Sequence, residues 1–302
     1  MMIELEKLST EENNPNSRDI ELQDSLEIVR RINEEDKKVA FCVEKELGSI
    51  SRLIDAILSR YEKETRIIYI GAGTSGRLGI LDASECPPTY GVSFEKVQGI
   101  IAGGNEAIFK AKENAEDKPE LGKQDLLNIN LTENDVVIGL AASGRTPYVL
   151  GAIEYANSIG AITGSITCSK SSDLSKVSQY PIEVPVGAEI VTGSTRMKAG
   201  TAQKMILNMI STTIMIKLGK VFSGYMVDVK TSNQKLIERA KRIIMKTANC
   251  DYEKASDALK KSGNDVKTAI VMILLNIDKD MAAEKLNQCD ENVAKIIHEN
   301  LK

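Results

Sequence analysis

Five short runs of aliphatic and β-branched residues restrict the middle of this chain to one class of fold. Stretches with helical spacing separate most of them, including 106–115 and 148–158. The runs are 66–70, 97–102, 135–140, 161–167 and 181–184. Continuous apolar strands that alternate with helices indicate a parallel sheet buried on both faces, because each crossover places a helix on the sheet. We therefore predict an α/β three-layer sandwich with a five-stranded parallel sheet.

The segments on either side of this sheet are expected to be helical. Apolar residues from Ile20 to about Glu62 recur at three- and four-residue spacing, after a polar, turn-rich stretch at 10–17. A long helix is expected over 200–218, and only short helices, with no strand, after about Val221. These patterns predict an N-terminal arm with helices over 1–52, a sheet domain over 53–221 and a small helical lobe over 222–302. The lobe resembles the three-helix ubiquitin-associated (UBA) type.

Charge, cysteine and histidine content exclude several classes of function. The net charge is −4 with both signs interspersed, which argues against a nucleic-acid or membrane-surface partner. The N-terminus lacks an apolar signal region and no long apolar stretch occurs, so no membrane segment is expected. Five widely spaced cysteines indicate reduced thiols in the cytoplasm. The only histidine is His298, which excludes a multi-histidine metal site and a histidine-based triad.

The first predicted strand ends in a glycine-rich loop. Gly71-Ala-Gly-Thr-Ser-Gly76 matches the Gly-x-Gly-x-x-Gly pattern of dinucleotide-binding loops. However, the next strand ends in Ala102-Gly-Gly-Asn105, where that pattern requires an acidic residue for the ribose. A Walker loop is excluded because no Gly-Lys-Ser/Thr follows. The hydroxyls of Thr74 and Ser75 can donate to a phosphate directly, so the loop predicts phosphate binding at a helix N-terminus.

A second loop of the same kind follows the strand at 135–140. It reads Ala-Ala-Ser143-Gly-Arg-Thr146-Pro, so Ser-Gly-Arg occurs twice, each time at the carboxyl end of a predicted strand. Ligands of parallel sheets bind at that edge, where strand order reverses. Two such loops fit one monophosphate and its sugar better than a dinucleotide. The predicted contacts are Gly73, Thr74, Ser75, Gly76, Ser143, Gly144 and Thr146.

The two loops resemble the sugar isomerase (SIS) domain, the fold of many phosphosugar isomerases and phosphosugar-sensing proteins, over residues 50–220. Neighbouring segments narrow the resemblance. They are Leu8–Ser17, Arg77–Gly91 with its Ser-Glu85-Cys-Pro-Pro, Ala102–Ala107, Ala115-Glu116-Asp117 and Gly187–Lys204. All of these look like the N-acetylmuramic acid 6-phosphate etherases and their relative, the glucokinase regulatory protein. The Gly187–Lys204 string is very specific to this pair of families.

The resemblance implies an enzyme that needs no cofactor and cleaves the D-lactyl ether at C3 of the sugar phosphate. The implied route is elimination from the open-chain aldehyde, then addition of water. Glu85 and Glu116 would be the acid/base pair, with Glu85 as acid at the ether oxygen and then base for the water, and Glu116 as base at C2; the reverse division stays open. Glu85 is expected just after the first helix and before the rigid Pro-Pro. The resemblance also implies further substrate contacts at Glu189, Ser194, Thr195, Arg196 and Lys198. Arg196 and Lys198 could instead pair with acids in the fold.

A homodimer with a shared site is expected from the apolar helices and the polar arm. Three other interpretations remain open. A non-catalytic phosphosugar sensor, like the glucokinase regulatory protein, would carry two phosphosugar-type domains in a longer chain. An aldose–ketose phosphate isomerase does not account for the Gly187–Lys204 string. A dinucleotide-dependent oxidoreductase lacks the acid for the ribose.

Overall fold

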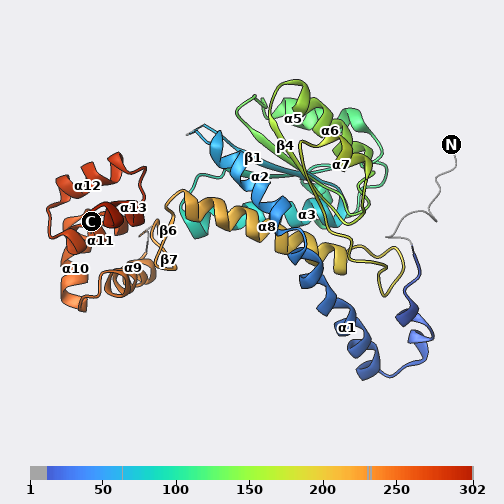
Figure 1. The fold of residues 1–302 in the computed structure, drawn as a ribbon, viewed down its shortest axis with the longest axis horizontal. Helices are drawn as coiled ribbons and strands as arrows, with labels where there is room; N and C mark the ends of the chain where they lie inside the picture. The colour runs from blue at the N-terminus through green and yellow to red at the C-terminus, as the bar shows by residue number, and fades with distance from the viewer. Residues whose placement is uncertain (1–11, 63, 230, 232, 301–302) are drawn as a thin grey trace. The chain divides into compact units, whose positions relative to one another are not determined.

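The computed structural model of the chain describes residues 12–62, 64–229, 231 and 233–300 (Figure 1). The beginning of the predicted arm and the first part of the Leu8–Ser17 motif lie outside the described residues. Internal contacts divide the chain into two compact units. One contains the described residues up to Ser84 and Phe94–Ile210, and the other contains Glu85–Ser93 and the residues from Ser211 onward. Each unit is described below by itself.

The first unit contains the predicted parallel sheet. Its strands are β1 (Ile67–Gly71), β2 (Val97–Ile101), β3 (Val136–Leu140), β4 (Ile162–Thr167) and β5 (Tyr180–Glu183), in the order β2-β1-β3-β4-β5. Every residue of β1 and β3 is buried, which explains why neither strand alternates with polar residues. The predicted α/β fold with five parallel strands is confirmed. Strand order reverses between β1 and β3, whose register aligns Gly71 with Leu140.

Helices cover both faces of the sheet, as Figure 1 shows. On one face, α5 (Pro119–Asn128), α6 (Pro147–Ser158) and α7 (Asp173–Val177) share a buried cluster with β1 and β3. On the other face lie α2 (Leu47–Ser59) and α3 (Gly73–Tyr90). There the side chain of Leu53 packs against Gly164, and Tyr69 packs against Gly79. The sheet therefore presents its strand ends, rather than its faces, to a ligand.

The predicted N-terminal helices are present. Two 3-10 helices, η2 (Pro15–Ser17) and η3 (Ile20–Leu22), precede α1 (Ser25–Glu44), and α2 follows after a short break. The Asp24 carboxylate accepts the amide of Glu27 at 2.8 Å and caps α1. The cap explains where the long helical pattern begins.

One predicted helix is mostly absent. The expected helix over 106–115 is only α4 (Glu106–Phe109), and the following helix is α5, which begins at Pro119. Residues 110–118 are exposed apart from Ala115, so they have no apolar stripe to pack. Asn114 has a φ of 61°, outside the helical region. Proline fits the first position of a helix, which explains why α5 starts at Pro119.

Helix α3 is longer than expected. The sequence places its end before Glu85, but the helix continues through Pro87 and Pro88 to Tyr90. Pro87 and Pro88 have no amide hydrogen, so the carbonyls of Ala83 and Ser84 lose their usual donors four residues ahead in the helix. The amide of Gly91 donates to the carbonyl of Pro87 at 3.0 Å and closes the last turn. Glu85 therefore lies on a helix and is exposed.

The second unit is a helical lobe. Its helices are α9 (Gln234–Thr247), α10 (Tyr252–Lys261), α11 (Val266–Leu275), α12 (Lys279–Gln288) and α13 (Val293–Asn300). They share one buried cluster that includes Ile244, Leu259 and Ile270. A hairpin of β6 (Val221–Phe222) and β7 (Tyr225–Met226) precedes them, contrary to the expectation that no strand follows Val221. Strands of two residues are too short to produce an alternating pattern.

Candidate active site

The first glycine loop joins β1 directly to α3. A Cβ atom on Gly76 would lie 2.7 Å from Cγ1 of Ile101 and 2.8 Å from the carbonyl oxygen of Gly71, so only glycine fits there. This close approach brings the first turn of α3 to the carboxyl end of β1. The first amides of a helix have no partner within the helix, and the helix dipole favours an anion beside them.

Two side chains of this loop hold neighbouring segments in place. The Ser75 hydroxyl, predicted as a phosphate contact, is buried and donates to Oε1 of Gln203 at 2.9 Å. Arg77 donates to the carbonyl oxygens of Ala107 and Ile108, both at 2.7 Å. The loop therefore offers backbone amides at the exposed Gly73 more directly than the Ser75 hydroxyl.

The structure brings the first loop and Glu116 together. Gly73 and Glu116 line one hollow of about 230 Å³, together with Arg77, Lys112 and Glu113. The carbonyl of Glu116 accepts the amide of Tyr148 at 3.0 Å, which attaches this segment to the first turn of α6. Thus the Glu116 carboxyl is exposed, while its backbone is fixed by the hydrogen bond from α6.

The second loop makes a similar strand-to-helix turn. Gly144 has a φ of 67°, and a Cβ atom there would lie 2.3 Å from Oγ of Ser172. The half-buried Ser143 accepts the amide of Arg145 at 3.3 Å through its hydroxyl oxygen. Thr146 is the N-cap residue of α6, and its carbonyl accepts the amides of Val149 and Leu150. The loop is therefore a rigid turn that leads into α6, whose first amides donate to the carbonyls of Glu116 and Thr146.

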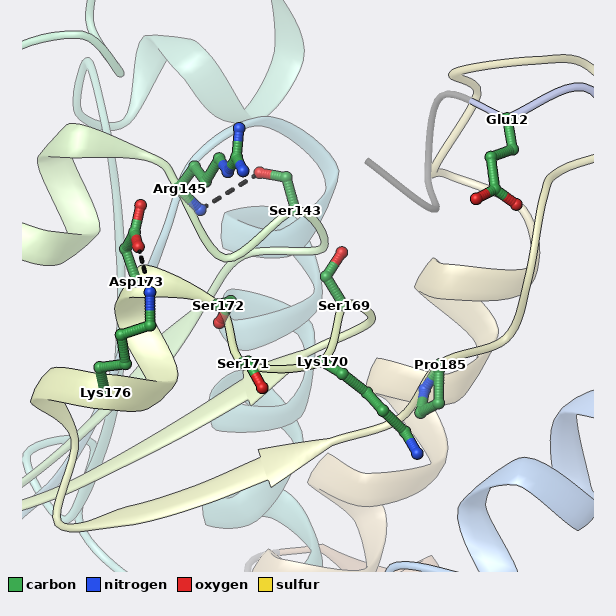
Figure 2. A pocket seen from close by; sticks show the side chains of 10 residues that line it. All are labelled: Glu12, Ser143, Arg145, Ser169, Lys170, Ser171, Ser172, Asp173, Lys176 and Pro185. Atoms are coloured by element: carbon green, nitrogen blue, oxygen red, sulfur yellow. Dashed lines mark hydrogen bonds and ion pairs between the residues drawn. The ribbon is translucent and has the colours of Figure 1, made fainter. Parts of the chain in front are cut away.

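A third loop, which the sequence patterns did not predict as part of the site, completes this region. The segment Ser169-Lys-Ser-Ser172 follows β4 and lines a hollow of about 360 Å³ with Ser143 and Arg145. Figure 2 shows these side chains around the hollow, with Glu12 opposite the ion pair between Lys176 and Asp173, which measures 2.9 Å. The signal was available, because three hydroxyls follow the end of a predicted parallel strand.

The charges of the two hollows differ. In the hollow at the third loop, Asp173 neutralises Lys176, so Arg145 and Lys170 face one carboxylate, Glu12. In the hollow at the first loop, Arg77 and Lys112 are balanced by Glu113 and Glu116. The hollow at the third loop therefore has the more positive lining and suits an anion better.

The Gly187–Lys204 string surrounds the N-terminus of α8 (Lys198–Lys217). The buried Glu189 carboxylate accepts the amides of Lys198 at 3.0 Å and Ala199 at 2.9 Å. The Lys198 ammonium donates to Glu35 at 2.6 Å. Lys198 therefore pairs with an acid in the fold, the alternative that the sequence left open. Glu189 likewise makes its contacts within the fold, because its carboxylate accepts two amides at the start of α8.

The remaining predicted contacts lie between these residues on the same string. Ser194 and Thr195 are half-buried, and Arg196 is exposed. The carbonyl of Thr195 accepts the amide of Gly200 at 3.0 Å, and a Cβ atom on Gly200 would lie 3.6 Å from Cγ2 of Thr74. The string thus reaches the first loop through Thr74.

Two curated relatives are similar to this chain over nearly its whole length. The chain is 56% identical over 297 residues to the N-acetylmuramic acid 6-phosphate etherase of Clostridium beijerinckii, covering 98% of both chains. It is 54% identical over 293 residues to that of Clostridioides difficile, covering 97% of this chain and 96% of the relative. This chain belongs to the N-acetylmuramic acid 6-phosphate etherase family.

Models of individual domains match the etherase chain in three places. Residues 49–157 match the N-terminal SIS domain of glucokinase regulatory protein, and residues 115–213 match the SIS domain. Residues 223–278 match the C-terminal lid domain of glucokinase regulatory protein. The UBA-like character of this lobe stays a prediction.

A solved structure shares the fold of this etherase family member. A protein assigned as a phosphosugar isomerase involved in capsule formation, from Bacteroides fragilis, is 18% identical with a TM-score of 0.50, covering 68% of this chain and 98% of that one. Within the described ranges, no helix is long and apolar enough to cross a membrane. Nor do the described residues include a group of three or more His, Cys, Asp or Glu placed to hold a metal ion.

Proposed function

We infer that this chain cleaves the D-lactyl ether of N-acetylmuramic acid 6-phosphate, giving N-acetylglucosamine 6-phosphate and D-lactate in the recycling of cell-wall sugar. The observation that carries the inference is the shared hollow of Gly73 and Glu116, in a chain that belongs to the etherase family. In this hollow a carboxylate lies beside the N-terminus of α3 at the switch point of the sheet, where open parallel sheets bind their ligands.

The substrate phosphate binds in the hollow at the third loop. Its support is the more positive lining, from Arg145 and Lys170, and the positive end of the α6 dipole beside Ser143. Neighbouring parallel strands lie about 4.8 Å apart. A phosphate beside the loops that follow β3 and β4 therefore leaves the sugar carbons free to extend to the loop after β1. There Glu116 meets the reacting end of the sugar.

Proton transfer by carboxylates accounts for the chemistry without a cofactor. In the open-chain sugar the C2 proton is acidic because it lies next to the aldehyde. Glu116 removes it, and an acid protonates the ether oxygen as the C3–O bond breaks, releasing D-lactate and leaving a double bond between C2 and C3. Water then adds at C3 and a proton returns to C2. Each positioned carboxyl contributes on the order of 10²–10⁴-fold to the rate.

Glu85 supplies the acid from the second subunit of a homodimer. Glu85 and Gly73 are twelve residues apart in α3, which corresponds to about 18 Å of helix. A sugar carbon held near Gly73 and Glu116 is too far from the Glu85 of the same helix. The exposed apolar side chains of Leu22, Leu26 and Val29 also favour a second copy as partner.

The proposed enzyme works in the cytoplasm. All five cysteines lie in the described part of the chain and none forms a disulfide, which suits a reducing compartment. Burial first, and then the nearby Glu189 charge, raises the pKa of Cys168 to about 12, so this thiol is not a nucleophile.

One assay tests the function. The purified chain is incubated with N-acetylmuramic acid 6-phosphate without added cofactor, and D-lactate is measured. We expect lactate release, deuterium at C2 of the product in heavy water and ¹⁸O at C3 in labelled water. A chain that binds the sugar phosphate and releases no lactate would instead be a phosphosugar sensor. Interconversion of aldose and ketose would indicate an isomerase.

A further inference from the structure

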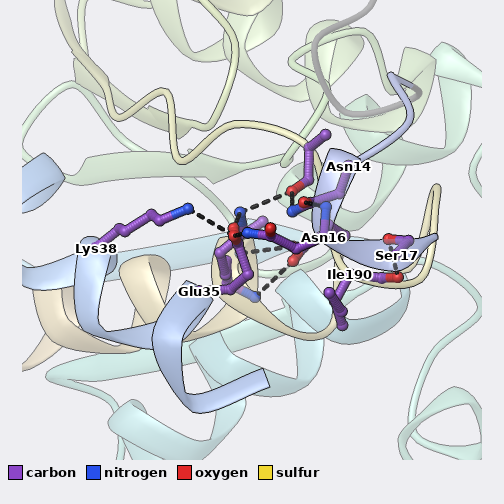
Figure 3. A network of polar contacts seen from close by, with 10 residues as sticks. Asn14, Asn16, Ser17, Glu35, Lys38 and Ile190 are labelled. Atoms are coloured by element: carbon purple, nitrogen blue, oxygen red, sulfur yellow. Dashed lines mark hydrogen bonds and ion pairs between the residues drawn. The ribbon is translucent and has the colours of Figure 1, made fainter. Parts of the chain in front are cut away.

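A buried ion pair joins α1 to the start of α8. The carboxylate of Glu35 and the ammonium of Lys198 meet at 2.6 Å, and both side chains are only 3% exposed. Asn16 donates to the same carboxylate at 2.7 Å, and Lys38 donates at 2.5 Å (Figure 3). Burying two charges is costly even where hydrogen bonds satisfy them, so such a pair often adds little net stability.

Lys198 connects the ion pair to the backbone of the Gly187–Lys204 string. Its ammonium also donates to the carbonyl of Ala188 at 2.7 Å, and its amide is held by Glu189. The residues between Glu189 and Lys198 therefore form a loop whose two ends are joined. Glu35 holds that junction from α1.

The arm holds the outer side of the same loop. Asn14 donates to the carbonyl of Ala188 at 2.8 Å, and Ser17 donates to the carbonyl of Ile190 at 2.6 Å. The hydroxyl of Thr192 donates to Oδ1 of Asn13 at 3.0 Å. Because Asn16 bonds Glu35, the arm and the ion pair form one connected network.

The other side of α8 meets the first loop. Gln203 accepts the buried Ser75 hydroxyl at 2.9 Å, and Gly200 lies against Thr74. A shift of the start of α8 would therefore move the loop that holds Gly73. A displacement of about 1 Å at a reacting centre can cost on the order of 10²-fold in rate.

We propose that Glu35 is a positioning residue of the etherase site, which holds the start of α8 through Lys198 and thereby sets the place of the first loop. The proposal rests on the proposed function, because its main readout is turnover. Glu35 does not touch the substrate, since it is enclosed by α1, the arm and Lys198.

The decisive variant removes both charges at once. Glu35→Leu with Lys198→Met replaces the buried pair by apolar side chains of similar size, a change that often leaves stability unaltered or higher. We expect an unfolding midpoint near that of the wild type and kcat lower by tenfold to a hundredfold. We expect the inhibition constant of inorganic phosphate to stay within about twofold of the wild-type value. The reason is that phosphate binds in the hollow at the third loop, which residues of the second and third loops line.

Two further variants serve as controls. Lys38 is the second ammonium that bonds Glu35, and its side chain is 56% exposed. Lys38→Met should leave kcat within about twofold of the wild-type value. Glu35→Asp keeps the charge and should retain more activity than the double variant. A double variant with the unfolding midpoint and kcat of the wild type would overturn the proposal. So would one in which kcat, phosphate affinity and the unfolding midpoint fall together, because that result indicates general loss of structure.

The wild-type lactate assay separates the two proposals. If the wild-type chain released no lactate, the proposed function would fail, and the positioning role would be read from binding of N-acetylglucosamine 6-phosphate. In that case we expect the double variant to lose at least about tenfold in affinity for this sugar phosphate relative to the wild type. Its affinity for inorganic phosphate should change by much less. Equal changes for both ligands would overturn the positioning role.

Discussion

The backbone carbonyl of Glu116 accepts a hydrogen bond from the amide of Tyr148 at 3.0 Å. This bond ties the candidate base to the first turn of α6, the helix that begins after the second loop. Tyr148 is itself fully buried and donates its hydroxyl to Asp125 at 2.6 Å. Burial, and then that bond to Asp125, raises the pKa of Tyr148, so the phenol stays protonated and the anchor neutral. The base is thus attached to the helix that begins beside the hollow at the third loop.

Replacing Glu116 tests its role as the C2 base. Glu116→Gln keeps the size of the side chain and removes its basicity, so we expect kcat to fall by about 10²–10⁴-fold while substrate still binds. Exchange of the C2 proton of N-acetylglucosamine 6-phosphate in heavy water should be lost as well. Glu113→Gln is the matched control from the same hollow, and an equal loss there would remove the special role of Glu116.

Mixing two inactive variants tests whether the site is shared. Glu85→Gln and Glu116→Gln are each expected to release almost no lactate. If each site combines Glu116 of one subunit with Glu85 of the other, a mixed dimer contains one intact site. Refolding the variants together should then restore about one quarter of the wild-type activity. A mixture as inactive as its components would place both carboxylates in one chain or remove Glu85 from the reaction.

Lys170 tests the place of the phosphate. Lys170→Ala removes a charge from the third loop, and we expect KM to rise by about tenfold with little change in kcat, as for a charged hydrogen bond of 1.5–3 kcal/mol that is partly exposed. Inhibition by inorganic phosphate should weaken by the same factor. Lys176→Ala lies in the same hollow but removes a lysine already paired with Asp173, so its effect should be smaller.

Gly144 tests the geometry of the second loop. Alanine at this position would have a positive φ and a Cβ only 2.3 Å from Oγ of Ser172. We expect Gly144→Ala to lower the free energy of unfolding by more than the ~1 kcal/mol typical of strain alone, and to weaken phosphate binding. Gly224→Ala is the control, because Gly224 has a φ of 78° and nothing within 4 Å of its Cβ position. Equal costs for the two variants would show that Ser172 moves freely.

The contribution of Glu35 to the free energy of unfolding should depend on pH. Burial would raise the pKa of this carboxyl, but hydrogen bonds from Lys198, Lys38 and Asn16 outweigh burial and hold it at about 2, below the ordinary 4.5. A carboxyl with a lowered pKa stabilises the fold above its unfolded-state pKa, and this contribution disappears as pH falls through the folded-state value. Denaturant unfolding should therefore show the advantage of wild type over Glu35→Gln shrinking between about pH 4.5 and 2. A constant difference over that range would contradict the low pKa.

Local patterns were sufficient for most of the fold. The five strands and the loops after β1 and β3 follow from continuous apolar runs ending in glycine and serine, because strand burial and tight turns restrict the residues that fit. The predicted helix over 106–115 was wrong for a local reason, whereas the predicted end of α3 was wrong for a tertiary one. Charged residues at 110–118 carry no apolar stripe, and packing carries α3 past Pro87, which local propensity opposes.

The sequence by itself determined the parallel sheet and the two Ser-Gly-Arg loops at its carboxyl edge, and its resemblance to the etherases made Glu85 and Glu116 the candidate acid and base. Only the tertiary structure decided which side chains face a ligand and which hold the fold. Ser75 donates to Gln203, Lys198 pairs with Glu35, and Ser169-Lys-Ser-Ser172 meets Ser143 across a hollow. Such contacts join residues far apart in the chain. A hydroxyl or a charge reveals its chemistry in the sequence, but its partner is set by how distant segments pack.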